Sequence, residues 1–152
     1  MPVLDDDMKR VVSEQQLGFV ATVNADGTPN LSPKGTLSVW DDEQLMFVDI
    51  RSPQTAANLE RNAAVEVNVV DPLLRKGYRF RGVAEVHRDR PIFERVVAER
   101  SSRGNPLVVQ SVVLIRVEVA VPVTSPAYDL GEGEPSIRAR WLTYWTRLWS
   151  RM

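Results

Sequence analysis

The stretch from residue 106 to residue 124, PLVVQSVVLIRVEVAVPVT, limits the fold more than any other part of the chain. It is too long and too rich in β-branched residues to be anything but a strand, with a bend along its length. Two other runs, AAVEVNVV (63–70) and YRFRGVAEVH (78–87), place apolar side chains at alternate positions, which is typical of strands with one buried face. Such a chain is built around a sheet.

Helix signals interrupt the strands at only a few points. The remaining predicted elements are a helix over 5–16, strands over 17–24, 28–40 and 44–50, helices over 52–62 and 90–102, and a last helix over 136–152. Strands and helices do not alternate one for one, so the sheet is not doubly wound. We predict a mainly β fold with α-helices, in which an antiparallel sheet closes, or nearly closes, into a barrel with helices at its ends.

The domain organisation follows from the Gly, Pro and acidic residues after residue 124. Residues 1–124 are expected to form one domain, because 152 residues are too few for two ordinary ones. Residues 125–152 are expected to be a linker and a helix that packs on the same domain or on a dimer partner.

Several classes of chemistry are excluded by composition. The chain has no cysteine and one histidine, so it cannot form a disulfide, a thiolate nucleophile or a histidine-based triad within one subunit. We expect no metal site. His87 is predicted to be an exposed residue at the end of a strand.

The charge distribution argues against some partners and favours another. A formal net charge of -1 does not suit a protein that binds nucleic acid through its phosphates. No apolar run is long enough to cross a membrane, and we expect a cytoplasmic protein. The segment RKGYRFR (75–81) carries four cations and no acid, which favours a small anionic ligand.

The segment SPQT is built to start a helix. Ser52 fits the N-cap position and Pro53 the first helical position, with Gln54 and Thr55 in the first turn. The N–H groups and hydroxyls of such a helix start are suited to bind an anion. Most helix starts of this kind only cap a helix, so this segment predicts a ligand only together with others.

Two further segments supply that support. SPKGT (32–36) breaks a predicted strand with Pro33 and Gly35, a pattern that marks a bulge or a close approach of a ligand to the backbone. Lys34 and Thr36 place a charge and a hydroxyl beside the break. Together with RKGYRFR, these segments predict a phosphorylated ligand.

In three stretches the sequence resembles the FMN-binding split-barrel proteins related to pyridoxamine 5'-phosphate oxidase. They are GFVATVNADGTPNLSPKGTL, LMFVDIRSPQTAANLERNAAVEVNVV and RKGYRFRGVAEVHRD, in the family's order. The resemblance implies a homodimer that binds FMN at its interface. It places Ser32, Lys34, Gly35 and Thr36 near the flavin ring edge or ribityl chain. It places Ser52, Gln54 and Thr55 at the phosphate, with Arg75, Lys76 and Arg79 reaching in from the same subunit or its partner.

Two departures from the family limit what the resemblance implies. Pyridoxamine phosphate oxidases carry an Arg-Lys pair at the helix start, where this chain has Gln54 and Thr55. Their C-terminal substrate-binding signature is also absent. We therefore predict FMN binding without vitamin B6 oxidation. The deazaflavin F420 is the alternative cofactor, and a flavin- or haem-binding protein without turnover is the alternative function.

The C-terminal helix carries apolar residues at helical spacing. These are Ile137, Trp141, Tyr144 or Trp145, Leu148 and Met152. Such a stripe is typical of a core or a subunit interface. An aromatic lid over a flavin and a weak membrane-surface helix are the other interpretations.

The function predicted from the sequence is that of an oxidoreductase acting on a small molecule. A bound flavin carries out the redox chemistry, so such an enzyme needs few acidic or basic side chains of its own. This agrees with a chain that is short of histidine and cysteine. A purely structural domain would leave SPKGT and RKGYRFR without a role.

Overall fold

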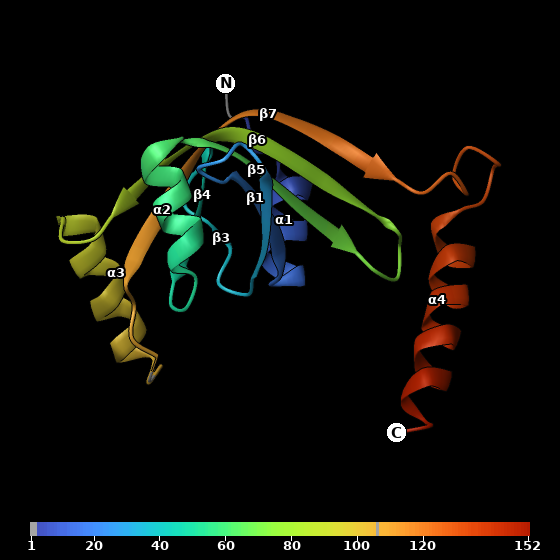
Figure 1. The fold of residues 1–152 in the computed structure, drawn as a ribbon. Coiled ribbons are helices and arrows are strands. Elements are labelled where there is room, and N and C mark those ends of the chain that lie inside the picture. Colours follow the sequence, from blue (N-terminus) through green and yellow to red (C-terminus); the bar gives the residue numbers. More distant parts are fainter. Residues whose placement is uncertain (1–2, 106) are drawn as a thin grey trace.

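The sheet is curled because its two edges are joined by a very short link. In the computed structural model, which describes residues 3–105 and 107–152, seven antiparallel strands follow the order β2-β1-β5-β6-β7-β4-β3. The edge strands β2 (Pro29–Lys34) and β3 (Ser38–Val39) are separated in the chain by residues 35–37 alone. The four steps from Lys34 to Ser38 span at most about 14 Å, so the two edges have to lie close together. The result is a barrel split along one side (Figure 1).

The predicted strand over 28–40 is in fact two, β2 and β3, which pair with β1 and β4 respectively, and the other elements follow the predicted order. The strands are β1 (Gly18–Val23), β4 (Gln44–Asp49), β5 (Ala64–Asp71), β6 (Lys76–His87) and β7 (Ser111–Thr124). The helices are α1 (Asp6–Gln15), α2 (Pro53–Arg61), α3 (Pro91–Ser102) and α4 (Glu134–Trp149). The predicted fold class, a mainly β split barrel with helices, is confirmed.

The last strand starts later than predicted. β7 begins at Ser111 and not near residue 106, and of the segment before it the structure describes residues 107–110. Ser111 pairs with Asp49, the last residue of β4. Beyond Asp49 the chain turns into α2, so the residues before Ser111 have no further strand to pair with. The predicted residue Pro106 lies outside the described residues.

The expected bend lies where β6 and β7 change register. The shift falls between Arg81 and Gly82 of β6. A Cβ atom on Gly82 would lie 2.1 Å from the carbonyl oxygen of Arg116, so a side chain does not fit there. Glycine therefore allows the two long strands to bend together around the core.

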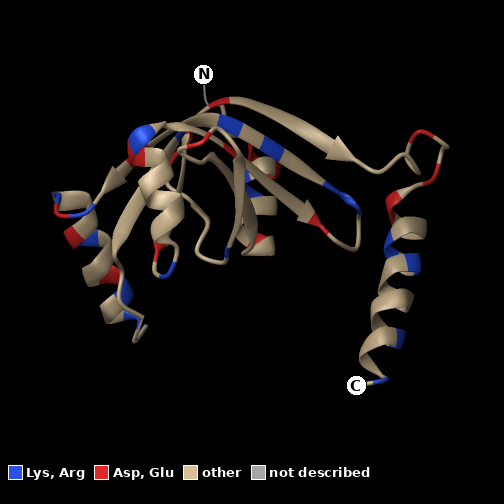
Figure 2. Cartoon of the chain, in the orientation of Figure 1, with Lys and Arg blue, Asp and Glu red and all other residues tan. Residues whose placement is uncertain are grey.

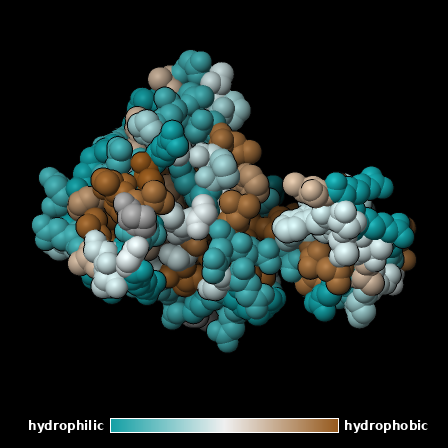
Figure 3. Space-filling view, turned by 90° about the horizontal axis from the view of Figure 1, so that it is seen from below, coloured by the Kyte–Doolittle hydropathy of each residue, from teal (hydrophilic) through white to brown (hydrophobic). Residues whose placement is uncertain are grey.

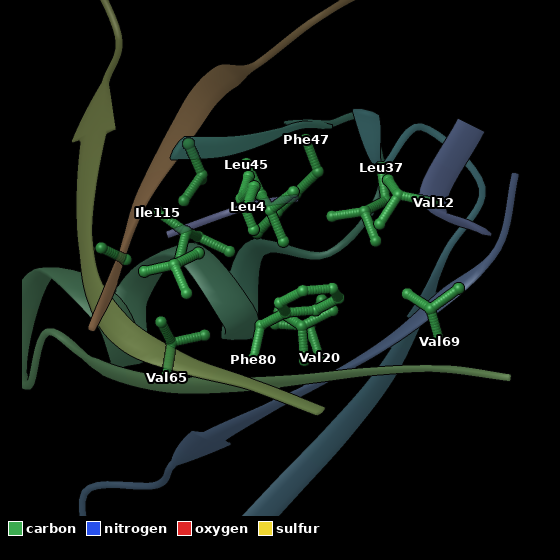
Figure 4. Packing of buried hydrophobic residues seen from close by; sticks show 14 of the residues in the cluster. Leu4, Val12, Val20, Leu37, Leu45, Phe47, Val65, Val69, Phe80 and Ile115 are labelled. Carbon is green, nitrogen blue, oxygen red and sulfur yellow. The ribbon is translucent and has the colours of Figure 1, made fainter. Parts of the chain in front are cut away.

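The core fills the inside of the curled sheet. Phe47 and Phe80 are fully buried at its centre, with Leu45 and Ile115 beside them (Figure 4). The helix α1 adds Val12 to the same cluster. This continuous cluster holds the strands that carry the candidate site.

A second, smaller cluster corrects the prediction for His87. The helix α3 packs on the outer face of the sheet, where Val96 meets Val48 and Val112. His87 pairs with Val112 across β6 and β7, so its side chain lies on that covered face. It is only 4% exposed, and the prediction of an exposed strand end was wrong because the sequence does not show which face α3 covers.

The C-terminal helix stands beside the barrel as a separate element (Figure 1). It follows β7 through residues 125–133 and packs at its start against the β5–β6 hairpin, where Ile137 is fully buried. Within the described chain, no helix is long and apolar enough to cross a membrane.

Candidate functional site

The start of α2 has the predicted geometry of an N-terminus. Ser52 is the N-cap residue and Pro53 the first helical residue, as predicted. The backbone N–H of Ser52 donates to Oδ1 of Asp49 at 2.7 Å, which fixes the turn between β4 and α2. In the described chain the Ser52 hydroxyl makes no capping hydrogen bond, so it is free to bind a ligand.

The next two predicted residues are less open than the sequence suggested. The side chain of Thr55 is 1% exposed, and its backbone N–H donates to the Ser52 carbonyl oxygen at 3.1 Å. Gln54 is exposed and donates from Nε2 to Oδ1 of Asn58 at 2.8 Å. Of the predicted side chains on this turn, Ser52 and Gln54 are the accessible ones.

A buried amide holds α2 in place over the sheet. Asn58 is fully buried and donates from Nδ2 to Oγ1 of Thr22 at 3.0 Å and to Oδ1 of Asn24 at 2.9 Å. Its Oδ1 accepts from Arg61 at 2.9 Å as well as from Gln54. A buried amide with all these partners positions the helix start precisely relative to β1.

Lys34 brings positive charge to the same end of the barrel. Its side chain is 5% exposed, at the end of β2, and Nζ lies 5.5 Å from the centre of the Phe47 ring. Burial lowers the pKa of Lys34, and the negative charge of Asp49 offsets only part of that effect. A phosphate group would supply the missing counter-charge.

The rest of SPKGT has mixed roles. Ser32 is half-buried and shares the inward face of β2 with Lys34. The Thr36 hydroxyl donates to the Val48 carbonyl oxygen at 3.0 Å and accepts from the Val48 N–H at 3.1 Å, so it ties the broken strand to β4. Gly35 is exposed, and a Cβ atom there would come no closer than 3.8 Å to the Gln16 carbonyl oxygen. This leaves the backbone of Gly35 open to a ligand.

The predicted cations of RKGYRFR lie elsewhere in the chain. Arg75 and Lys76 lie at the hairpin end of β6, while the opposite end, at His87, lies beside the end of β4. The eleven steps between Lys76 and His87 correspond to roughly 35 Å of strand. One subunit therefore does not bring these cations to the start of α2. Arg79 lies between them on the exposed face and pairs with Glu66 at 2.9 Å.

A hollow of about 600 Å³ opens beside Gly35 and Thr36, between the β3–β4 edge and α3. Trp40 lies on one side, with the guanidinium carbon of Arg95 4.9 Å from its ring centre. Arg100 also lines the hollow, and its buried Nε has no hydrogen-bond partner among the described residues. The volume is within the range of small-molecule sites.

Sequence reasoning missed the residues that α3 contributes. Arg95 and Arg100 lie in a predicted helix of mixed charge, where surface arginines are common. The spacing of Arg95 and Arg100 gives no signal without knowledge of where the helix packs. Asn58 was also missed, although an Asn within the apolar positions of a short helix is a usable signal.

These features fit a ligand with a phosphate group and a planar ring. Lys34, Ser52 and the start of α2 provide an anion-binding end, and the open backbone at Gly35 leads to a hollow that contains an aromatic ring. The buried carboxylate of Asp49 hydrogen-bonds to the Ser52 N–H, so part of its charge is already engaged.

A comparison with models of protein families shows which family this chain belongs to. The model of the pyridoxamine 5'-phosphate oxidase family matches residues 4–121. The chain belongs to the pyridoxamine 5'-phosphate oxidase family. The resemblance noted in the sequence is thus confirmed, and the match ends before the linker and α4. A comparison with curated proteins finds no match.

Solved structures of the family share the fold. HupZ of Group A Streptococcus is 34% identical, with a TM-score of 0.72 over 80% of this chain and 95% of HupZ. An F420 reductase is 23% identical, with a TM-score of 0.60 over 78% of this chain and 98% of the reductase. An FMN-binding protein of Syntrophomonas wolfei is 12% identical, with a TM-score of 0.65 over 79% of this chain and 86% of that protein. The last two are similar in fold alone.

Proposed function

We propose that this protein is an FMN-binding oxidoreductase that acts on a small molecule. The observation that carries the proposal is the buried cation of Lys34, which Asp49 links to the uncapped Ser52 at the start of α2. Family membership supports it, because the chain shares the fold of FMN-binding relatives. A bound FMN would supply the transfer of hydride or electrons.

The protein's own residues would bind and orient the cofactor. Lys34 and Ser52 would hold the phosphate, with Gln54 beside them and the buried Thr55 supporting the turn. Gly35 would let the ring approach the backbone. Thr36 would hold that backbone in place through its two hydrogen bonds to Val48.

The substrate would occupy the hollow beside α3. Arg95 and Arg100 give this space positive charge, and Trp40 gives it an aromatic wall. We infer that the substrate carries a carboxylate or phosphate group on a planar body, because such a molecule would pair with both features.

The proposal includes a homodimer and a cytoplasmic location. Arg75, Lys76 and Arg79 are too far from the start of α2 in one chain, so a partner subunit would have to supply them. Exposed apolar side chains on the outer face of β1 and β2, among them Phe19 and Leu31, offer a surface for that partner. The cofactor would then lie where two subunits meet.

F420 is the alternative cofactor, since it presents the same planar ring and phosphate. A titration of the purified protein with FMN and with F420, followed by absorption and by gel filtration, separates the two. Retention of FMN, with reduction by NADPH and reoxidation by an acceptor, supports the proposed enzyme. Retention without turnover would favour a binding protein, and failure to retain either cofactor would leave the proposal without support.

A further inference from the structure

The base of α4 is fixed to the β5–β6 hairpin. The guanidinium carbon of Arg75 lies 3.4 Å from the centre of the Trp141 ring, and Lys76 pairs with Glu134. The hydroxyl of Tyr128 donates to the Leu74 carbonyl oxygen at 2.7 Å. These contacts hold α4 as an arm with a defined direction.

One side of this arm is apolar along its whole length. Ile137 and Trp141 face the hairpin, and the same side of the helix continues as Tyr144, Trp145 and Leu148. Tyr144 is 50% exposed and Leu148 is 39% exposed, because the hairpin ends before them. In the space-filling view the arm forms a lobe beside the body, with hydrophobic side chains on its surface (Figure 3). We call Tyr144, Trp145 and Leu148 the arm stripe.

The arm is also basic. After Glu134 it carries Arg138, Arg140, Arg147 and Arg151 and no acidic residue (Figure 2). Arg140 pairs with Glu132. In the part of the chain that the structure describes, no acidic partner is found for Arg147 or Arg151.

A second surface of the molecule has the opposite charge, and we call it the acidic ridge. It consists of exposed side chains from the start of α1 and from the β3–β4 turn: Asp5, Asp6, Asp41, Asp42 and Glu43. The two segments are joined by a hydrogen bond from the Leu4 N–H to the Asp42 carbonyl oxygen at 3.0 Å. Lys9, which pairs with Asp42, neutralises only part of the ridge.

We propose that α4 docks on a second copy of this chain, with the arm stripe against that copy and Arg147 and Arg151 at its acidic ridge. In a twofold dimer each copy gives one arm and receives the other, so both contacts form at once. The match between the basic arm and the acidic ridge favours a protein partner. Leu142 and Trp149 of the same helix are 51% and 71% exposed, so binding to a lipid surface is the outcome that the vesicle measurement below tests.

The arm is an addition to the family's common core. The family match ends at residue 121, well before Glu134. This inference rests on the homodimer of the proposed function and does not depend on flavin. The role that we propose for α4 is to strengthen that dimer.

A charge-swap experiment tests the arm. The arm variant R147E/R151E and the ridge variant D6K/D42K/E43K, whose three reversals leave the ridge with a net positive charge, are each compared with the native protein by analytical ultracentrifugation over a range of concentrations, without flavin. We expect the dimer Kd of each variant to rise by at least about tenfold, because each loses two pairs of opposite charges and gains repulsion. The variant R147K/R151K keeps the charge and is expected to associate normally.

Mixing the two reversed variants gives the decisive result. In a heterodimer, the negative arm of the arm variant would meet the positive ridge of the ridge variant. The native basic arm of the ridge variant would meet the native acidic ridge of the arm variant. The equimolar mixture should therefore form heterodimers with nearly native affinity. Unchanged association of either variant, or failure of the mixture to recover, would overturn the proposal.

Further measurements separate a loss of docking from unfolding and from binding to a lipid surface. Circular dichroism melting of each variant shows whether it is folded, and L148A, which changes no charge, should weaken the dimer as well. Binding of the native protein to phosphatidylserine vesicles that is lost in R147E/R151E would overturn the proposal in favour of a lipid surface. Because the association is measured without cofactor, failure of flavin binding alone would count against the proposed function and not against the arm.

Discussion

The ammonium group of Lys34 lies 5.5 Å from the centre of the Phe47 ring, at the end of β2 where the strand breaks. Phe47 is fully buried, so its ring provides a fixed apolar surface beneath the charge. A cation in this place is attracted to the ring face but has lost much of its hydration. The pair therefore prepares one end of the barrel for an anion.

The affinity for FMN should fall as the pH rises through the lowered pKa of Lys34. A bound phosphate favours the protonated form of Lys34. Above the pKa that Lys34 has in the free protein, the lysine is neutral and has to take up a proton for FMN to bind. The expected loss is at most about tenfold per pH unit, in a window below the ordinary lysine pKa of about 10.4. Fluorescence titration at a series of pH values above 7.5 measures it.

The variant Lys34→Gln is the control for this pH dependence. It should bind FMN more weakly and show a flatter profile across the same window. Without ligand, the sign is opposite: native stability should rise with pH between the lowered and the ordinary pKa, because the buried lysine becomes neutral first in the folded state. A native FMN affinity that does not change with pH would contradict the role of Lys34.

Gly35→Ala should lower FMN affinity without affecting the fold. The added Cβ atom lies 3.8 Å from the nearest atom, the Gln16 carbonyl oxygen, so the protein itself has room for it. A ring lying against this backbone would meet the new methyl group. Thermal melting and FMN titration of the same sample separate the two effects. Gly82→Ala is the contrasting variant and should unfold at a lower temperature, since its Cβ atom would lie 2.1 Å from the Arg116 carbonyl oxygen.

Thr36→Val should destabilise the link between the broken strand and β4. The change removes both hydrogen bonds between the Thr36 hydroxyl and the Val48 backbone. A loss of about 1–3 kcal/mol in the free energy of unfolding is expected, because the Val48 N–H is left without a partner. Denaturant unfolding measures this loss. Thr36→Ser keeps the hydroxyl and should retain most of the stability, whereas equal losses in the two variants would point to packing.

Arg100→Met should weaken the binding of anionic aromatic molecules in the hollow beside α3. Arg100 lines the hollow, and its buried Nε lacks a hydrogen-bond partner in the described chain, so a ligand anion in the hollow would supply the guanidinium with a counter-charge. The probe 1-anilinonaphthalene-8-sulfonate should bind at least about fivefold more weakly to this variant, a loss of roughly 1 kcal/mol. The neutral probe N-phenyl-1-naphthylamine should be little affected. Arg147→Met, on the arm, is the matched control, and an equal effect there would argue against the hollow.

The order of strands and helices could be read from the sequence because local patterns determine it. The alternation of Val65, Val67 and Val69 and the Ser52-Pro53 helix start depend on neighbouring residues alone. The start of β7 was misplaced because it depends on where β4 ends. The burial of His87 was missed for a similar reason, since α3 covers it from a distant part of the chain.

The candidate site could be predicted only in part. Lys34 and Ser52 are connected through Asp49, whose charge acts on Lys34 and whose Oδ1 accepts from the Ser52 N–H, and both residues belong to segments that the sequence had singled out. Arg75 and Lys76 lie at the other end of β6, and their contacts with α4 could not be foreseen from spacing. Arg100 contributes through helix packing, which the sequence does not reveal.

The comparison of FMN with riboflavin tests the central claim most directly. Riboflavin has the same ring and lacks the phosphate, so the ratio of the two affinities isolates the phosphate contacts of Lys34 and Ser52. The native protein should bind FMN at least about a hundredfold more tightly than riboflavin, and this ratio should shrink strongly in the double variant Lys34→Gln/Ser52→Ala. Equal affinities of the native protein for the two flavins, or a ratio that the double variant leaves unchanged, would contradict a phosphate site at the start of α2.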